Sequence, residues 1–299
     1  MIKYIVVIVL ILICFLTEEM YRYVFRAKPS ALFNMFYVPK GHEDNYYIVR
    51  DEKKAVFKKA YNEEFEIEGH KGETLKGFYY PLGSEGKKIV FIVHGYRSEH
   101  NETAGMLYEF YKEQGIDMFC CDHTAHGKSE GNYIGFDMFE TEDCLKWVDF
   151  LVEKFGEDTE IFLHGFSMGG ATVMKMSSYC PSNVKFIIED SGFKNAFASL
   201  DHQVGPMYQP LRLINRICAG YDLNDSDVTE SLLKSEIPML FVHGRDDKLV
   251  PFVNGPELYE MYRGEKDCFF PEGTRHIESM YTEPEKYGEK IKEFINKYL

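Results

Sequence analysis

The sequence has no excess of basic residues, and this absence argues against a nucleic-acid-binding surface. Its 34 Lys and Arg residues are outnumbered by 48 Asp and Glu residues, so the formal net charge is −14 at pH 7. A surface of that sign repels phosphate backbones, and no stretch of the chain concentrates basic side chains. We therefore expect no nucleic-acid partner.

The sequence also lacks a disulfide framework, internal repeats and low-complexity segments. Its seven cysteines are odd in number and spread over 299 residues, which indicates reduced, mostly buried thiols. Hydrophobic residues make up 45% and charged residues 27%, a balance that excludes a disordered chain. The length suits one large α/β domain or two small ones.

The longest apolar run, Ile5 to Leu16, lies at the N-terminus. As a helix it measures about 18 Å, which is shorter than the ~30 Å hydrocarbon core and closer to a signal-peptide core. No small-x-small cleavage site follows it, and aromatic residues suited to a membrane interface continue the pattern through Phe25. We expect residues 1–26 to be an uncleaved membrane anchor. A cleaved signal, which would make the protein secreted, and a buried helix are the alternatives.

The side of the membrane on which the body lies is left open by the flanking charges, which slightly favour a cytoplasmic body. Deleting residues 1–25 is expected to release the protein from membranes without loss of activity. Residues 27–62 contain prolines and a charged stretch, and they are predicted to be a connector with room for a short helix.

From residue 63 onward the pattern predicts a parallel α/β sheet. A hairpin over 64–68 and 74–81 comes first, and short apolar strands then alternate with amphipathic helices. The strands are expected at 88–93, 116–121, 161–164, 184–189 and 239–243, and the helices at 104–111, 142–155, 171–179 and 284–299. Such alternation is typical of a mostly parallel sheet covered by helices on both faces.

One interval, residues 193–237, interrupts this alternation. It contains no buried-strand pattern but many bulky apolar side chains. Insertions of this size in an α/β domain are more often lids or binding caps than structureless loops. We expect a helical cap; a plain surface pair of helices is the alternative.

The strand at 161–164 leads into a G-x-S-x-G motif that centres on Ser167. A helix pattern follows, which gives the strand–turn–helix context that this motif needs. Gly165 and Gly169 leave space for a strained backbone that exposes the serine hydroxyl. The N-terminus of the following helix favours a developing oxyanion. Ser167 is therefore the candidate nucleophile.

A serine nucleophile needs a base, and the base needs an orienting acid. Asp247 follows the predicted strand at 239–243, and His276 follows a further short strand that the apolar segment 268–270 predicts, so both come after Ser167 in the expected chain order. We expect His276 to accept the serine proton and Asp247 to orient the imidazole. Asp246 and Asp190 are the alternative acids. Two backbone N–H groups, those of Tyr96 and Met168, are the candidate oxyanion hole.

These motifs resemble the serine α/β-hydrolase superfamily, in particular its esterase, lipase and serine-aminopeptidase-like branch. The resemblance covers residues 63–299 and includes the His94–Gly95 turn, the Asp122–Ser129 loop, the elbow at Ser167 and the Gly244–Pro251 segment. Thr124 and Ala125 depart from the Asp-x-Arg-Gly-His-Gly-x-Ser pattern of that branch. The chain is also similar to membrane-tethered bacterial hydrolases with an N-terminal apolar segment.

The resemblance implies an α/β-hydrolase fold with a helical cap, and hydrolysis of a small-molecule acyl ester through an acyl-enzyme, with no cofactor. A serine peptidase, or a thioesterase or acyltransferase, would use the same residues. A non-catalytic binding or scaffold protein is the alternative from another class. Gly127-Lys128-Ser129 lacks the first glycine of a phosphate loop, and His123 and His126 lack a zincin motif, so we expect neither a nucleotide nor a metal site. The acyl chain, the leaving group and the oligomeric state are left open.

Overall fold

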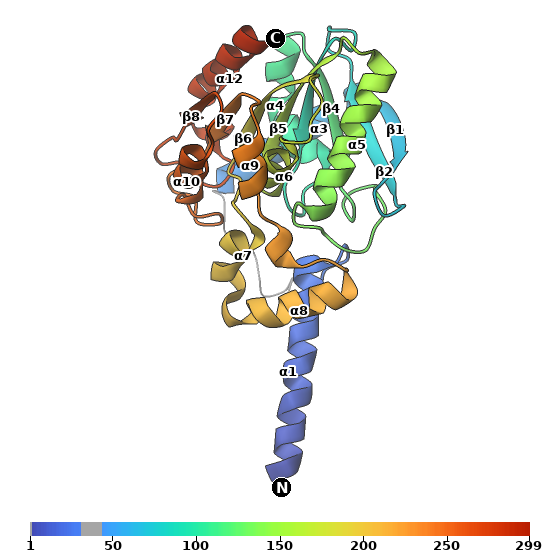
Figure 1. Cartoon of the computed structure of the whole chain (residues 1–299), viewed down its shortest axis with the longest axis vertical. Coiled ribbons are helices and arrows are strands. Elements are labelled where there is room, and N and C mark those ends of the chain that lie inside the picture. Colours follow the sequence, from blue (N-terminus) through green and yellow to red (C-terminus); the bar gives the residue numbers. More distant parts are fainter. Residues whose placement is uncertain (1, 31–43) are drawn as a thin grey trace.

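A computed structural model of the protein describes residues 2–30 and 44–299 (Figure 1). Its centre is an eight-stranded sheet in the order β1-β2-β4-β3-β5-β6-β7-β8. The strands are β1 (Glu63–Glu68), β2 (Thr74–Tyr80), β3 (Lys88–Val93), β4 (Asp117–Asp122), β5 (Glu160–Phe166), β6 (Val184–Asp190), β7 (Met239–Val242) and β8 (Lys266–Phe269). β1 and β2 form an antiparallel hairpin, β2 pairs antiparallel with β4, and all other neighbours are parallel. The predicted fold class is confirmed.

Alternate residues of the central strands β3, β4 and β5 belong to two separate hydrophobic clusters, one on each face of the sheet. On β3, Phe91 points to the face that carries α5 (Met138–Phe155), α6 (Met168–Met176) and α10 (Asn254–Met261), while Ile92 points to the face that carries α4 (His100–Glu113) and α12 (Pro284–Tyr298). The sheet is therefore covered on both faces, which is why its central strands are apolar throughout.

The interval between β6 and β7, in which we expected a cap, is helical. It contains α7 (Ala196–Val204), η1 (Gly205–Met207), α8 (Tyr208–Cys218), η2 (Leu223–Asp225) and α9 (Thr229–Lys234). α7 and α8 lie at one end of the body, opposite the end at which the C-terminus lies (Figure 1). A last short helix, α11 (Ser279–Thr282), precedes α12.

The predicted connector contains a helix, α3 (Asp44–Phe57), which packs against α4. Its last residue, Phe57, is fully buried and stacks on Tyr80 of β2, with ring centroids 4.3 Å apart. The part of the predicted connector at 31–43, and residue 1 of the predicted anchor, lie outside the described residues.

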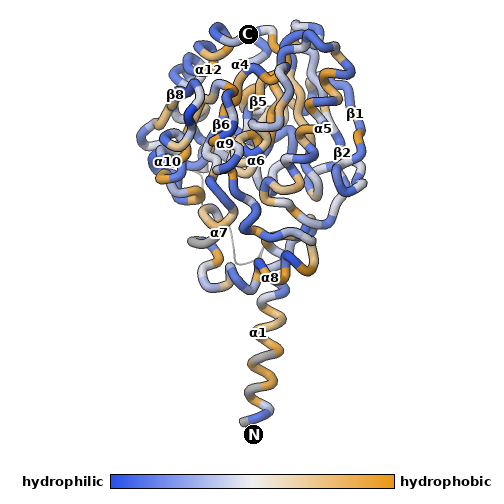
Figure 2. The backbone as a smooth tube through the Cα atoms, in the orientation of Figure 1, coloured by the Kyte–Doolittle hydropathy of each residue, from blue (hydrophilic) through white to orange (hydrophobic). Residues whose placement is uncertain are grey.

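The N-terminal helix α1 (Ile2–Phe25) has an exposed half and a buried half. The large apolar side chains described between Tyr4 and Leu16 are 42–76% exposed, and this half protrudes from the body as a hydrophobic rod (Figure 2). The last turn belongs to the body, because Val24 and Phe25 are buried in the main hydrophobic cluster. The chain leaves the helix through a β-bridge between Arg26 and Tyr133.

Candidate active site

Ser167 occupies a strained turn between β5 and α6. Its φ of 56° and ψ of −116° are unfavourable for a residue with a Cβ atom, and its N–H donates to the carbonyl of Asp190 at 2.8 Å. The two flanking glycines are required by close approach. A Cβ atom on Gly165 would lie 2.2 Å from the carbonyl oxygen of Gly169, and one on Gly169 would lie 2.1 Å from that of Val93. The turn therefore holds the hydroxyl beyond the carboxyl end of the strand.

The structure brings the three predicted triad side chains together. The Oγ of Ser167 lies 2.8 Å from Nε2 of His276, and Nδ1 of that imidazole lies 2.7 Å from Oδ2 of Asp247. Ser167 and His276 are 109 positions apart in the sequence, and Asp247 and His276 are 29 positions apart. His276 follows β8 and Asp247 follows β7, so adjacent parallel strands deliver both side chains to the same sheet edge.

Asp247 is the only one of the three candidate acids that contacts the imidazole among the described hydrogen bonds. Its Oδ1 accepts the N–H groups of Leu249 and Val250, each at 2.9 Å. Burial disfavours its charge, but His276 and the hydrogen bonds around the carboxylate outweigh that effect and hold the pKa of Asp247 well below its usual range. Asp247 is therefore ionised and fixed in orientation.

The other two acids have different surroundings. Asp246 is exposed to solvent. Asp190 is buried, which raises its pKa to about 6, and its carboxylate accepts the hydroxyls of Ser191 at 2.8 Å and Tyr287 at 3.0 Å. Neither carboxylate has a described hydrogen bond to His276.

A second histidine at the triad acid was missed in the sequence. Nε2 of His243 lies 3.3 Å from Oδ2 of Asp247 and 3.0 Å from the carbonyl oxygen of Val250. Burial lowers the pKa of His243, but the contacts with Asp247 outweigh burial and raise it. The signal was a histidine directly after an apolar strand and four residues before the acid, yet one sequence does not separate such a residue from ordinary packing.

The two predicted oxyanion donors lie beside the nucleophile. Met168 is the first residue of α6, where a backbone N–H has no acceptor within the helix. Tyr96 follows β3, and a Cβ atom on the preceding Gly95 would lie only 3.2 Å from that of Ser167. Tyr96, Met168 and Ser167 line the same cavity.

The loop after β4 holds the Tyr96 loop in position. Nε2 of His126 accepts the N–H of Arg97 at 3.1 Å, and its Nδ1 lies 3.0 Å from the carbonyl oxygen of Thr124. Burial lowers the pKa of His126 to about 3, so the ring is neutral and has a free lone pair for this bond. His126 belongs to the Asp122–Ser129 loop, on which the family resemblance partly rests. Its hydrogen bond to the N–H of Arg97 gives a physical reason for a histidine at this position.

The cavity at Ser167 and His276 has a volume of about 470 Å³, within the range of small-molecule sites. It lies between the sheet edge, the expected cap helix α7, and two helices, α1 and α3, that the sequence did not connect with the site. Its walls include Tyr23 of α1, Tyr47 of α3 and Leu200 of α7. The predicted anchor helix thus forms part of the cavity wall.

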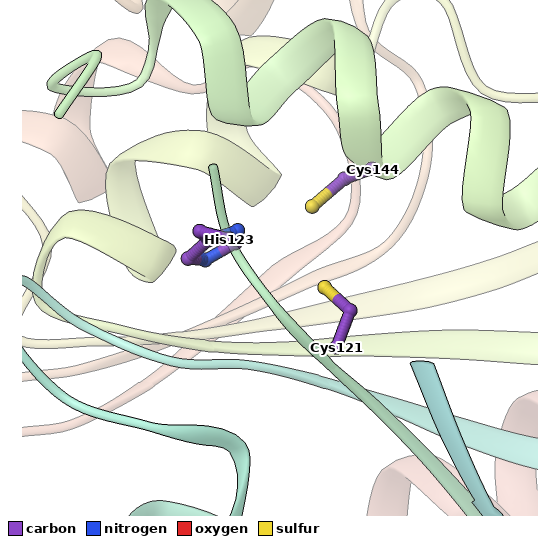
Figure 3. A group of neighbouring side chains, drawn as sticks. All are labelled: Cys121, His123 and Cys144. Carbon is purple, nitrogen blue, oxygen red and sulfur yellow. The ribbon is translucent and has the colours of Figure 1, made fainter. Parts of the chain in front are cut away.

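A separate group of potential metal ligands lies under the sheet edge (Figure 3). Ligand atoms of Cys121 on β4, His123 and Cys144 on α5 lie within 4.8 Å of one another, and all three residues are buried. Burial raises the pKa of the Cys144 thiol well above its usual value, whereas a thiolate is the form that binds metals. Nε2 of His123 lies 3.1 Å from the carbonyl oxygen of His94. The group does not line the cavity, and we assign it to core packing.

Solved structures that share this fold include two esterases and a protein described as an alpha/beta hydrolase. The esterase Pf2001 from Pyrococcus furiosus superimposes with a TM-score of 0.65 at 22% identity, covering 80% of this chain and 91% of that one. Est1E from Butyrivibrio proteoclasticus, with ferulic acid bound, gives a TM-score of 0.64 at 21% identity, covering 78% and 98%. The chain therefore has the α/β-hydrolase fold.

Sequence comparisons agree with this fold. A family model described as serine aminopeptidase, S33, matches residues 84–219 of the chain. The uncharacterised protein YqkD of Bacillus subtilis is 26% identical over 241 residues, which cover 78% of each chain. The uncharacterised protein YfhR of Escherichia coli is 24% identical over 241 residues, covering 78% of this chain and 80% of its own.

Proposed function

We propose that this α/β-hydrolase is a serine hydrolase that cleaves a carboxylic ester through an acyl-enzyme intermediate. The observation that supports it is the continuous hydrogen-bonded chain from Ser167 through His276 to the ionised Asp247. A packing arrangement has no need of a strained serine, a buried imidazole and a buried carboxylate in this order.

In the proposed reaction, Nε2 of His276 accepts the hydroxyl proton as Oγ of Ser167 attacks the carbonyl carbon of the ester. The oxyanion accepts hydrogen bonds from the N–H groups of Tyr96 and Met168, and Asp247 stabilises the imidazolium. The carbon–oxygen bond to the alcohol then breaks, and His276 returns the proton to the leaving oxygen. A water molecule, deprotonated by the same imidazole, hydrolyses the acyl-enzyme and frees the acid and Ser167.

The cavity favours an ester over an aminopeptidase substrate. Among the described residues that line it, the one carboxylate is Glu102, and this side chain already binds Lys54 at 2.7 Å and Ser98 at 3.0 Å. These contacts lower the pKa of Glu102 although burial opposes its ionisation. The free amino group of an aminopeptidase substrate would need a carboxylate to bind it, and Glu102 is already bound to Lys54 and Ser98.

The test is labelling with a fluorophosphonate followed by mass spectrometry of the full chain. We expect one adduct, on Ser167, and none on Ser167→Ala. A label on another residue, or none on folded protein, would contradict the proposed nucleophile and favour the scaffold alternative. A panel of nitrophenyl esters of increasing chain length, aminoacyl anilides and acyl thioesters then identifies the leaving group, and faster turnover of anilides or thioesters would overturn the ester assignment.

We also propose that α1 is an uncleaved membrane anchor. Within the described residues it is the one helix with the length and composition to cross a membrane, a property that signal sequences share. Cleavage near the end of the helix would remove Tyr23 and Val24 from the cavity wall and Phe25 from the core. This dependence of the body on the helix favours an anchor over a cleaved signal.

A further inference from the structure

The exposed apolar half of α1 reaches the body with no spacer. It runs from Tyr4 to Leu16, about 20 Å of helix, and only three residues separate it from Met20, which lines the cavity. α1 is one continuous helix, so no flexible linker holds the body away from whatever surrounds the apolar half. If that half lies in a bilayer, the end of the body from which it emerges must lie at the bilayer surface.

α8 lies at this end and crosses α1 where α1 leaves the body (Figure 1). Its inner face is fixed, because Leu211 is 1% exposed and Asn215 is fully buried. Asn215 also joins the two helices, since its Oδ1 accepts the hydroxyl of Tyr21 at 3.3 Å. The orientation of α8 relative to α1 is therefore set by packing.

The outer face of α8 is apolar although it is exposed. Leu213 and Ile217, one turn apart, are 59% and 76% exposed, and Phe197 of the neighbouring α7 is 48% exposed. Arg216, with 58% of its side chain exposed, precedes Ile217 in the chain, and its Nε also lies 3.5 Å from Oδ2 of Asp222. An exposed apolar stripe next to arginine is the composition of helices that lie in the membrane interface, where the apolar face enters the acyl boundary and the cation reaches lipid phosphates.

We infer that the outer face of α8, together with Phe197, is a bilayer-contact surface that rests in the interface of the membrane holding α1. The occupant of this face is lipid rather than a second protein copy, because α8 packs against α1 at the end of the body from which the exposed apolar half of α1 emerges. The exposed half of α1 is about 10 Å shorter than the hydrocarbon core is thick. A body that rests in the membrane interface agrees with this short length.

The proposed contact of α8 with the bilayer also indicates a substrate class, an inference that rests on the proposed ester hydrolysis. The cavity wall includes Tyr23 and Val24 of α1 and Leu200 and Val204 of α7, the two helices that meet the proposed interface. Because the cavity lies directly above the lipid surface, its substrate is the ester of an amphiphile that resides in the bilayer.

The contact is tested with tryptophan fluorescence in vesicles of phosphatidylcholine with brominated acyl chains. The one native tryptophan, Trp147, is fully buried, so it gives a constant background. In the full chain, Leu213→Trp is expected to lose most of its added emission to bromine quenching. The matched control Tyr179→Trp, at an exposed site after α6, is expected to lose little. Ile8→Trp reports independently on insertion of α1.

Each outcome is decisive. Quenching of Ile8→Trp without quenching of Leu213→Trp overturns the α8 contact and leaves the anchor intact. Loss of quenching at both sites overturns the anchor as well. A blue-shifted but unquenched Leu213→Trp means that protein covers this face, which also overturns the inference.

The substrate class is tested with the variant Leu213→Glu. We expect severalfold slower hydrolysis of a long-chain ester presented in vesicles and unchanged hydrolysis of a short soluble ester, because this residue does not line the cavity. Equal rates of wild type and variant on the vesicle ester overturn the substrate class. Failure of the wild type to cleave either ester refutes the proposed function instead, while the quenching result stands.

Discussion

Asp247 and Asp246 are adjacent in the chain and have opposite environments. Asp247 is 5% exposed and bonded to His276, whereas Asp246 is exposed. The pair therefore offers a matched test of one carboxylate against its neighbour, with the same change of charge.

We expect Asp247→Asn to lower kcat about 10⁴-fold, because an amide no longer holds the imidazole in the tautomer that can accept the serine proton. Asp246→Asn is expected to keep kcat near the wild-type value. The measurement is steady-state hydrolysis of a short ester, with the thermal unfolding midpoint of each variant as the folding control. A folded Asp247→Asn enzyme with near-normal kcat would remove Asp247 from the proposed triad.

Asp122 at the end of β4 acts on stability. Its carboxylate accepts the N–H groups of His100 at 2.9 Å and Lys128 at 2.8 Å. Burial opposes its ionisation, but the hydrogen bond and charge of His100 outweigh burial and lower its pKa to about 2. A carboxylate whose pKa is lowered on folding stabilises the native state above its unfolded pKa, and this stabilisation is lost as the pH falls through the native value.

Asp122→Asn is therefore expected to reduce the free energy of unfolding by about 2 kcal/mol at pH 7. The deficit should shrink as the pH falls from about 4 toward 2, where Asp122 itself becomes protonated in the native state. Urea unfolding of both proteins in nonionic detergent across this range measures it. Asp158→Asn, which removes an exposed ion pair with Lys87, is the control and should change stability little. A deficit that does not vary with pH would contradict the role of the Asp122 charge.

At the scale of elements, the C-terminal end of α1 is tied to the proposed oxyanion loop. The hydroxyl of Tyr96 donates to the carbonyl of Val24 at 3.0 Å, and the guanidinium of Arg97 donates to the carbonyls of Tyr23 and of Arg26, the latter at 3.0 Å. The last carbonyls of a helix lack intrahelical donors, so these side chains satisfy them and place a cation at the negative end of the helix dipole.

This contact changes the expected effect of truncation. Removal of residues 2–16 should leave folding and turnover of a soluble ester intact, because the described side chains of this segment are exposed. Removal of residues 2–25 should destabilise the fold by several kcal/mol and abolish most activity, because buried apolar side chains and the acceptors for Tyr96 and Arg97 are lost. Thermal unfolding and kcat of the two truncated proteins test this. Normal activity after removal of residues 2–25 would show that α1 does not support the site.

At the scale of the whole molecule, the sheet fixes one end of the body as the functional end. The strands β5, β7 and β8 all deliver their carboxyl ends to the cavity, as is usual for ligand sites in open α/β sheets. α1, α7 and α8 lie at that same end (Figure 1). The proposed catalytic chemistry and the proposed membrane contact are therefore neighbours, and the rest of the body extends away from this end (Figure 1).

The fold and the three triad candidates were predictable because their signals are local. Apolar runs that alternate with amphipathic helices give the sheet, and the glycines at 165 and 169 reflect a close backbone approach within one turn. The expectation that the whole segment 1–25 is dispensable does not agree with the buried end of α1. Nothing in an apolar run of helix indicates which of its turns will pack against a distant loop.

The sequence by itself thus determined the alternation of strands and helices, the glycine-flanked serine turn, and the order of the candidate nucleophile, acid and base along the chain. Only the tertiary structure decided that Asp247 rather than Asp190 meets the imidazole, that His243 adjoins this acid, and that α1 closes the cavity beside an exposed apolar α8. The physical reason is that periodicity and turn chemistry act over a few residues. The contacts that choose among chemically equal side chains join separate elements, such as the loops of Asp247 and His276, which are 29 positions apart, and they exist only once the sheet has assembled.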